Sequence, residues 1–446
     1  MNPTRKVLVI AYYFPPSLEV GRMRTVKFCK FLPEFGWAPV VVTPKLPRQF
    51  DPALLAEIPP GTEVHRAGRG TWLINMLAAA RGVRNALRRA RRTAATTAGP
   101  TPSAGAPAPA GSSWIVKLYW PDLEAPWIGP AARQALALAP SCQVLYSSGW
   151  PMSCHVAALG VAQRTGLPWV MDLRDPWEPA CTYPTAWQRR HYAKVERACV
   201  TAARWVVNVN ENLTRQHREQ FPDLAAEKFV TICNGIDPED FAALPAPPAV
   251  PPLRVTFAGN LYRGKSGLPL VEAVRILHEE HGLTPSDLAI TLMGSGNAPM
   301  AGPLKSLGLE SFFRLLPRQP HQTALADLGS SHVALLIFDA QDTGATKLSE
   351  VTYLKKPALA LVPRTPLREQ LERAGAVCVD PDDSRALADA LLNIYQGLRQ
   401  GQAMPPLALE GAVMATRRFQ AGELAGLLDL AAGGATGRWT PRLPVL

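Results

Sequence analysis

Short apolar runs alternate with longer segments of helical periodicity along most of this 446-residue chain. Before residue 242 the apolar runs fall at 7–11, 39–43, 144–147, 169–172, 205–208 and 229–232, and the helical segments at 24–35, 153–164 and 187–203. Such short, uniformly apolar runs are typical of parallel strands that helices cover on both faces. The pattern predicts a doubly wound α/β domain.

The same alternation starts again after a proline-rich stretch at 242–252, which is expected to be a stiff linker. Further strands are expected at 254–258, 289–293, 313–315, 333–337, 358–362 and 376–379. A chain of this length exceeds what one core supports. We therefore predict two doubly wound Rossmann-like α/β domains, 1–241 and 253–405. Residues 406–446 are expected to form a helix that packs back on the first domain, and then a tail.

The net charge of +11 favours anionic partners, and charge alone fits nucleic acid, acidic lipid or a phosphorylated ligand. The seven cysteines are scattered and include no Cys-x-x-Cys pair, which indicates reduced thiols in a cytosolic protein. The apolar run at 7–11 is short for a signal peptide and is expected to be the first strand. No apolar stretch of the sequence is long enough to cross a bilayer.

Two segments fit neither domain core. Residues 71–92 combine a hydrophobic cluster with six arginines and predict a basic amphipathic helix. Such a helix either lies on an anionic membrane surface or is solvated on the protein surface. Residues 93–113 are almost entirely Ala, Thr, Pro, Gly and Ser, a composition that predicts disorder.

Asp342 and Glu350 are eight positions apart, with a Gly-Ala-Thr-Lys turn between them. A glycine-containing turn that opens a helix directs free N–H groups and the positive end of the helix dipole at a phosphate. Thr346 and Lys347 lie in this turn, and Glu350 lies about one helical turn further on, where it is placed to accept hydrogen bonds from a ribose. The motif therefore fits a nucleotide-sugar site, and it also fits an ordinary helix start with two acidic residues.

Loops after two strands of the first domain carry further candidates. Gly21 precedes a helix, and its backbone can approach a phosphate closely; an ordinary strand-to-helix loop is the alternative. Asp172, Arg174 and Asp175 end the strand expected at 169–172. There they either bind sugar hydroxyls or an acceptor, or pair with one another as scaffolding.

In the second domain Gly259, Arg263 and Lys265 lie in a glycine-rich loop after the first strand, where two cations suit a diphosphate leaving group. Gly294 follows the next strand and is expected on the same ligand side. His155, near the start of a first-domain helix, is a candidate acid–base or hydroxyl-binding group, with a structural role as the alternative. No His/Cys cluster has metal-ligand spacing, so no metal site is expected.

Taken in order, these motifs resemble the family 4 glycosyltransferases of the GT-B fold, in the bacterial branch that has an Asp-x-Arg-Asp-Pro-Trp segment. The resemblance rests on Pro-Pro and Gly-Arg within 15–22, Phe-Gly-Trp at 35–37, Asp-Leu-Arg-Asp-Pro-Trp at 172–177, Asn-Gly-Ile-Asp at 234–237, Phe-Ala-Gly at 257–259, and the acidic pair with Tyr-Leu-x-x-x-Pro at 353–357. It implies that the second domain binds the nucleotide donor, that the first binds the acceptor, and that a cleft separates them.

The resemblance also implies roles for single residues. Glu350 would bind the ribose, Asp342 would contact the donor sugar, and Gly21, Arg263 and Lys265 would meet the diphosphate, aided by N–H groups around Thr346 and Lys347. Asp342, Arg263 and Lys265 would be the catalytic residues. The family usually retains anomeric configuration and works without a metal, so no cofactor besides the nucleotide-sugar donor is expected.

The resulting hypothesis is a cytoplasmic enzyme, peripheral on the inner face of the plasma membrane through 71–92. It would transfer a sugar from a nucleotide diphosphate sugar to a glycan or lipid-linked acceptor in bacterial surface polysaccharide or glycoconjugate synthesis. A nucleotide-sugar epimerase of the same fold is one alternative. A basic nucleic-acid-binding protein is the other, but the arginines concentrate at 81–92 without interleaved aromatics, so no nucleic acid partner is expected.

Overall fold

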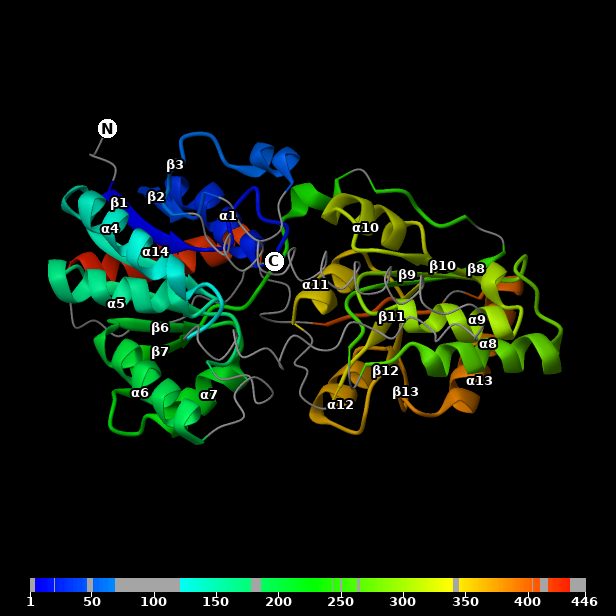
Figure 1. Cartoon of the computed structure of the whole chain (residues 1–446). Helices are drawn as coiled ribbons and strands as arrows, with labels where there is room; N and C mark the ends of the chain where they lie inside the picture. The colour runs from blue at the N-terminus through cyan, green and yellow to red at the C-terminus, as the bar shows by residue number, and fades with distance from the viewer. Residues whose placement is uncertain are drawn as a thin grey trace, which may run out of the picture. The chain divides into compact units, whose positions relative to one another are not determined.

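The computed structural model describes residues 5–19, 21–45, 51–68, 121–177, 186–242, 244–248, 251–262, 265–339, 345–402, 404–409 and 416–433, with the backbone alone at 186–188 and 345–346. The described residues form two compact units, and each is considered by itself (Figure 1). The first unit holds the described residues up to Asn234 and those from Arg417 on. The second unit holds the described residues between Gly235 and Thr416.

The first unit is built on a parallel sheet, which over the described residues has seven strands in the order β3-β2-β1-β4-β5-β6-β7. The strands are β1 (Arg5–Ala11), β2 (Trp37–Thr43), β3 (Glu63–Arg66), β4 (Val144–Gly149), β5 (Trp169–Leu173), β6 (Trp205–Asn208) and β7 (Phe229–Thr231). The direction of winding reverses between β1 and β4. This is the position at which doubly wound sheets bind their ligands, outside the carboxyl ends of the strands.

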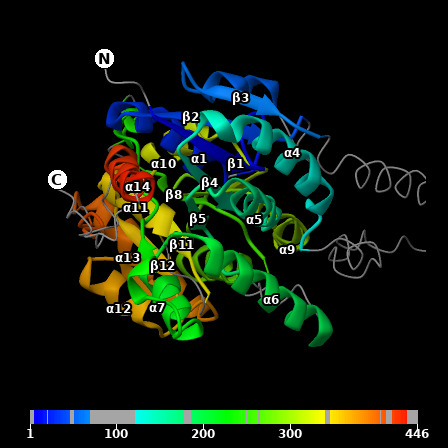
Figure 2. The ribbon, with the colours of Figure 1, turned by 90° about the vertical axis from the view of Figure 1, so that its left-hand side faces the viewer.

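Helices cover both faces of the first sheet because its central strands are apolar on both sides. The helices are α1 (Arg22–Phe31), α4 (Ile128–Leu138), α5 (Ser153–Thr165), α6 (Ala186–Ala202), α7 (Glu211–Gln220) and α14 (Arg417–Ala432). Leu8 and Ile10 of β1 belong to the core under α4 and α5, and Val7 and Val9 to the core under α1 and α14. Figure 2 shows α1 and α14 on one side of β1 and β4, with α4 and α5 on the other.

The helix α14 lies in the first unit although it follows the second unit in sequence. Its Leu424, Leu427 and Leu428 are buried in the same core as residues of α1. At the far end of the helix, Trp37 Nε1 donates to Asp429 Oδ1 at 2.9 Å. This helix falls within 406–446, where the sequence predicts a helix that returns to the first domain.

The second unit has a parallel sheet of six strands over the described residues, in the order β10-β9-β8-β11-β12-β13. The strands are β8 (Leu253–Ala258), β9 (Leu288–Met293), β10 (Phe313–Leu316), β11 (Val333–Ile337), β12 (Ala358–Leu361) and β13 (Val377–Val379). The helices are α8 (Leu268–His281), α9 (Ala301–Ser306), α10 (His321–Gly329), α11 (Ala345–Tyr353), α12 (Pro366–Arg373) and α13 (Ser384–Arg399). One core lies under α8 and α13, and the other lies under α11 and α12.

The observed units differ from the expected domains at their boundaries. The chain passes to the second unit after Asn234, not after residue 241, because Phe241 already packs on Tyr353 and the carbonyl of Pro248 accepts from His332. The short edge strand β3 was not expected, since its Glu-Val-His-Arg sequence is mostly polar. The predicted amphipathic helix at 71–92 and the predicted disorder at 93–113 lie outside the described residues.

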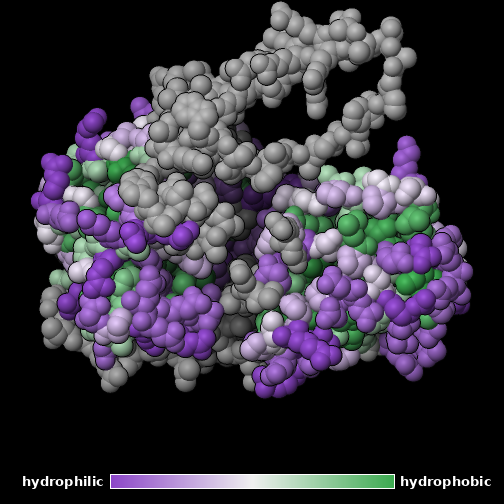
Figure 3. All heavy atoms as spheres, turned by 60° about the horizontal axis from the view of Figure 1, so that its bottom comes forward, coloured by the Kyte–Doolittle hydropathy of each residue, from purple (hydrophilic) through white to green (hydrophobic). Residues whose placement is uncertain are grey.

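Hydrophilic residues cover much of the described surface on the face shown in Figure 3, with smaller hydrophobic patches between them. Among the described residues, no helix is both long and apolar enough to span a membrane. The cysteines of the described part of the chain are free thiols, and most of them are buried.

Candidate functional site

The carboxyl ends of the strands form one edge in each sheet, and the loops that follow them carry most of the residues that the sequence singled out. In the first unit these loops follow β1, β4 and β5. In the second unit they follow β8, β9 and β11. Because parallel strands end on the same side, side chains far apart in sequence meet at these edges.

Gly21 and Arg174 meet at the edge of the first sheet. Gly21 is the N-cap residue of α1, and a Cβ placed on it would lie 1.8 Å from Nη1 of Arg174. Arg174 is itself oriented by the chain after β4, because its Nε donates to the carbonyl of Gly149 at 2.8 Å and its Nη2 donates to the carbonyl of Trp150. A guanidinium in front of a helix N-terminus is a favourable position for a phosphate.

Asp172 is buried within the unit. Its carboxylate pairs with Arg24 of α1, with Nη2 to Oδ1 at 2.9 Å and Nε to Oδ2 at 2.9 Å, and it accepts from Tyr146 at 2.6 Å and from Ser148 at 3.2 Å. Burial opposes ionisation, but Arg24 and these donors outweigh it and lower the pKa of Asp172. The scaffolding alternative therefore describes Asp172, although its partner is Arg24 and not a neighbour in the motif. Asp175 is exposed.

His155 is completely buried in α5. Its Nδ1 lies 2.8 Å from Ser147 Oγ, which also accepts from Trp169 Nε1 at 2.8 Å. Its Nε2 has no hydrogen-bond partner among the described residues, and a Cβ placed on Gly149 would lie 2.3 Å from it. Burial lowers the pKa of His155 to about 3, so the ring is neutral at physiological pH. The imidazole lies directly beneath the loop that orients Arg174.

In the second unit the loops after β8 and β9 cross in close contact. Gly259 N donates to the carbonyl of Met293 at 2.9 Å, and a Cβ on Gly294 would lie 1.7 Å from the carbonyl oxygen of Gly259. Gly294 has φ of +139°, a conformation that side chains rarely adopt. Lys265 follows in the first of these loops, with Nζ 4.8 Å from the centre of the Tyr262 ring. The structure thus brings Gly259 and Gly294 together at the edge.

Glu350 of α11 is the most strongly organised carboxylate of this edge. Its side chain is 7% exposed, and it pairs with Lys347 at 2.7 Å through Oε2 and with His321 at 3.1 Å through Oε1. Burial alone would raise its pKa, but Lys347 and His321 together lower the pKa of Glu350 to about 2. The carboxylate is therefore ionised, and with about four lone-pair positions it retains acceptor capacity beyond these two contacts.

Three predicted residues cannot be placed in this site. Asp342 and Arg263 lie outside the described residues, and only the backbone of Thr346 is described. The predicted catalytic set is therefore represented by Lys265 alone. Within the described residues, no cluster of His, Cys, Asp or Glu has the arrangement of a metal site.

Two residues that organise the edges were not predicted. Arg24 is the partner of Asp172, and His321 is a partner of Glu350. The proline before His321 is a weak indication in the sequence that a helix begins there; Pro320 is the N-cap residue of α10, and His321 is its first residue. No local signal distinguishes Arg24, because its partner is 148 residues away.

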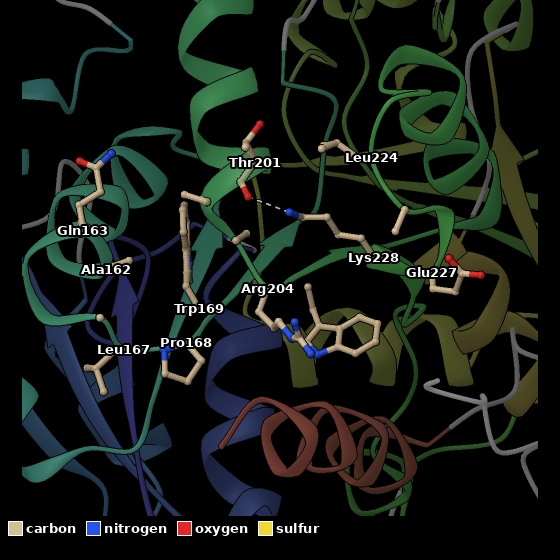
Figure 4. Close-up of a pocket in the computed structure, with 15 residues that line it drawn as sticks. Ala162, Gln163, Leu167, Pro168, Trp169, Thr201, Arg204, Leu224, Glu227 and Lys228 are labelled. Carbon is tan, nitrogen blue, oxygen red and sulfur yellow. Dashed lines mark hydrogen bonds between the residues drawn. The ribbon is translucent and has the colours of Figure 1, made fainter. Parts of the chain in front are cut away.

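A hollow of about 920 Å³ lies elsewhere in the first unit, where β5 and β6 begin (Figure 4). Lys228 points across it to the last turn of α6 and donates to the carbonyl of Thr201 at 2.8 Å. Burial lowers the pKa of Lys228 to about 8. A cation at a helix carboxyl end stabilises the helix. The hollow is thus remote from the carboxyl edge, and its lysine has a structural partner.

Comparison with solved structures gives the class of fold. The Anabaena protein HepE, crystallised with UDP and glucose, matches with a TM-score of 0.58 at 13% identity, over 96% of this chain and 98% of that one. A glycosyltransferase from Rickettsia africae matches with a TM-score of 0.54 at 12% identity, over 97% and 96%. A putative UDP-N-acetylglucosamine 2-epimerase from Listeria monocytogenes matches with a TM-score of 0.57 at 13% identity, over 99% of both chains.

No protein-family model and no curated protein matches the chain. The structural likeness, together with the two parallel sheets and their covering helices, shows that this chain has the two-domain Rossmann-like GT-B fold. The predicted fold class is confirmed.

Proposed function

We propose that this protein is a glycosyltransferase that transfers a sugar from a uridine diphosphate sugar to a hydroxyl acceptor. The observation that carries the proposal is the ionised, buried Glu350, which Lys347 and His321 hold in α11, the helix that follows β11 at the carboxyl edge of the second sheet. A fixed carboxylate accepts strong hydrogen bonds from two adjacent hydroxyls, as a ribose offers them. The likeness to HepE, crystallised with UDP and glucose, supports the choice of nucleotide.

The remaining residues fit a diphosphate. In the second unit, Lys265 supplies a cation in the glycine-rich loop after β8. In the first unit, the N-terminus of α1 at Gly21, with the Arg174 guanidinium beside it, is by itself suited to a phosphate. Cations and N–H groups at the leaving diphosphate stabilise the charge that develops as the glycosidic bond breaks. Charge stabilisation by these groups is the basis for proposing a metal-independent reaction. Retention of configuration and membership of family 4 follow from the motif resemblance and are proposed with it.

The biological assignment is also a proposal. A glycan or lipid-linked acceptor, a role in bacterial surface polysaccharide synthesis and attachment to the inner membrane face through 71–92 rest on the sequence resemblance and on the basic segment. Sedimentation with anionic liposomes, with and without residues 71–113, tests the attachment. Equal sedimentation of the two forms would contradict it.

The central test uses purified protein, UDP-glucose and related donors, and the variant Glu350→Gln. The variant loses the charged acceptor of the ribose, which is worth about 2 kcal/mol, so kcat/KM for the donor is expected to fall about thirtyfold. Glu372→Gln is the matched control, because Glu372 pairs with Arg368 on the surface of α12 in the same unit. Equal kcat/KM in wild type and Glu350→Gln would remove Glu350 from the site.

A second candidate is a nucleotide-sugar 2-epimerase, because the Listeria protein matches over 99% of both chains. The two activities separate when the donor is incubated alone. An epimerase converts UDP-N-acetylglucosamine without an acceptor, whereas a transferase requires an acceptor hydroxyl for sugar transfer. Nuclear magnetic resonance of the sugar ring protons distinguishes the two products.

A further inference from the structure

The carboxylate of Glu350 has one partner on each of its two oxygens. Lys347, three residues earlier in α11, has its Nζ 2.7 Å from Oε2, and His321, the first residue of α10, has its Nε2 3.1 Å from Oε1. A carboxylate offers about four lone-pair positions, which are about two on each oxygen. Among the described residues no third side-chain partner of this carboxylate is found. One position therefore remains on each oxygen, which matches a ligand with two adjacent hydroxyls.

The two partners constrain the carboxylate differently. Lys347 carries a compact charge on a flexible stem, and its N–H groups rotate about the terminal bond, so it neutralises Glu350 without fixing the plane of the carboxylate. The His321 imidazole is planar and directs its N–H within the plane of the ring. It reaches Glu350 from a different helix, and its backbone follows Pro320, whose carbonyl accepts from Ala324 at 3.0 Å. His321 is therefore the partner that gives the carboxylate a fixed direction.

The contact between His321 and Glu350 is available in either protonation state of the imidazole. Glu350 is ionised and can only accept, so in a neutral ring Nε2 carries the proton and donates to Oε1. A protonated ring donates from the same atom. The direction of the Glu350 carboxylate thus does not require a charged His321.

We infer that His321 is the positioning residue that orients Glu350 toward both hydroxyls of a ribose, and that it makes the protein selective for ribonucleotides over 2′-deoxyribonucleotides. The inference rests on the proposed function for its ligand class, and its residues all belong to the second unit. A nucleotide without the 2′-hydroxyl leaves one oxygen of the buried carboxylate without a donor, which is how a site built for a hydroxyl rejects the analogue that lacks it. Without His321 the carboxylate can turn toward the single remaining hydroxyl, and the selectivity is lost.

Equilibrium binding to the full-length protein tests this role without relying on turnover. Isothermal titration calorimetry with UDP and with 2′-deoxy-UDP gives the ratio of the two dissociation constants for each variant. The ratio is expected to be about tenfold or more in the wild type and below about threefold in His321→Ala. His321→Gln is expected to restore it to about fivefold or more, because the amide N–H of glutamine can take the place of the Nε2 donor. His281→Ala, at the exposed end of α8 in the same unit, is the matched control and is expected to keep the wild-type ratio.

The ratio separates positioning from loss of stability, because a partly unfolded variant binds both nucleotides more weakly by the same factor. Kinetics add a second readout: in His321→Ala, KM for UDP-glucose is expected to rise about fivefold while kcat changes less than about twofold. A wild-type ratio near one, or an unchanged ratio in His321→Ala, would overturn the role of His321 even where sugar transfer is observed. A ratio that depends on His321 in a protein that transfers no sugar would retain this role and refute the proposed transferase.

Discussion

The carboxyl edges of the two sheets are both formed by parallel strands, but the charged residues at them are arranged differently. In the first unit, Arg24 and Asp172 are almost completely buried and form an ion pair with each other. In the second unit Lys347 and His321 remain 39% and 28% exposed around the buried Glu350. The comparison teaches that a cluster of charged residues at a strand end is not by itself a ligand site. What matters is whether its partners leave one side open.

A buried ion pair needs nearly complete hydrogen bonding to offset the loss of hydration. Asp172 has it, because Arg24, Tyr146 and Ser148 all donate to its oxygens. Glu350 pairs with Lys347 and His321, whose side chains remain partly exposed to water. The Arg24–Asp172 pair is therefore a fixed part of the first edge, whereas Glu350 is paired with side chains that remain partly exposed.

The largest expected effect is that of Asp172→Ala on stability. Removing the carboxylate leaves Arg24 buried without its counter-charge, which costs about 3–5 kcal/mol. Urea denaturation measures the loss, and Tyr146→Phe is expected to cost about 1 kcal/mol because it removes one donor and no charge. The control Asp223→Ala, at an exposed pair with Arg197, is expected to leave the midpoint unchanged. A loss below 1 kcal/mol in Asp172→Ala would contradict the scaffolding role.

The loop contact of the second edge is expected to show the next largest effect. In Gly294→Ala the new methyl group meets the carbonyl oxygen of Gly259 and forces a positive φ on alanine, which together cost about 3 kcal/mol. Gly302→Ala is the control, since its Cβ enters open space in α9 and favours the helix. Thermal unfolding of both variants measures the difference. Equal melting temperatures would show that the two loops can separate freely.

The smallest expected effect concerns His155 and pH. Its pKa is about 3 in the folded protein and about 6.5 in an unfolded chain, so the unfolded state takes up the proton first as pH falls. Stability is therefore lost from pH 6.5 downward, by about 2 kcal/mol at pH 5. His155→Phe has no such titrating group and does not lose this stability. The difference in unfolding free energy between wild type and variant, measured by urea denaturation, is therefore expected to be smaller at pH 5 than at pH 6.5. A constant gap would place the ring in contact with water.

The architecture could be predicted from the sequence because the strands and helices of this fold have distinct local patterns of apolar residues. The runs at 7–11 and 333–337 became β1 and β11, and the prediction of two parallel α/β domains is confirmed by the two sheets. The chain passes to the second unit after Asn234, and the contact of Phe241 with Tyr353, which composition does not show, places the segment before the proline-rich stretch in that unit. The edge strand β3 has no such apolar run, because an edge strand with exposed sides need not be apolar.

The candidate site was only partly accessible. The spacing of Lys347 and Glu350 follows from helix geometry, so their ion pair could be anticipated. The contacts of Arg24 with Asp172 and of His321 with Glu350 join residues distant in sequence, and a single chain gives no pattern that pairs them. The contact of Arg174 with Gly21 likewise joins residues distant in sequence, which only the folded sheet brings together.

The return of α14 to the first unit has a consequence for the order in which the protein is made. Over the described residues the second unit is one continuous stretch, whereas the core of the first unit includes Leu424 and Leu428, which are synthesised after that stretch. Until then, the apolar face of α1 has no cover from α14. The second unit can thus complete its core during translation, and the first is left as the part of the nascent chain most in need of a chaperone.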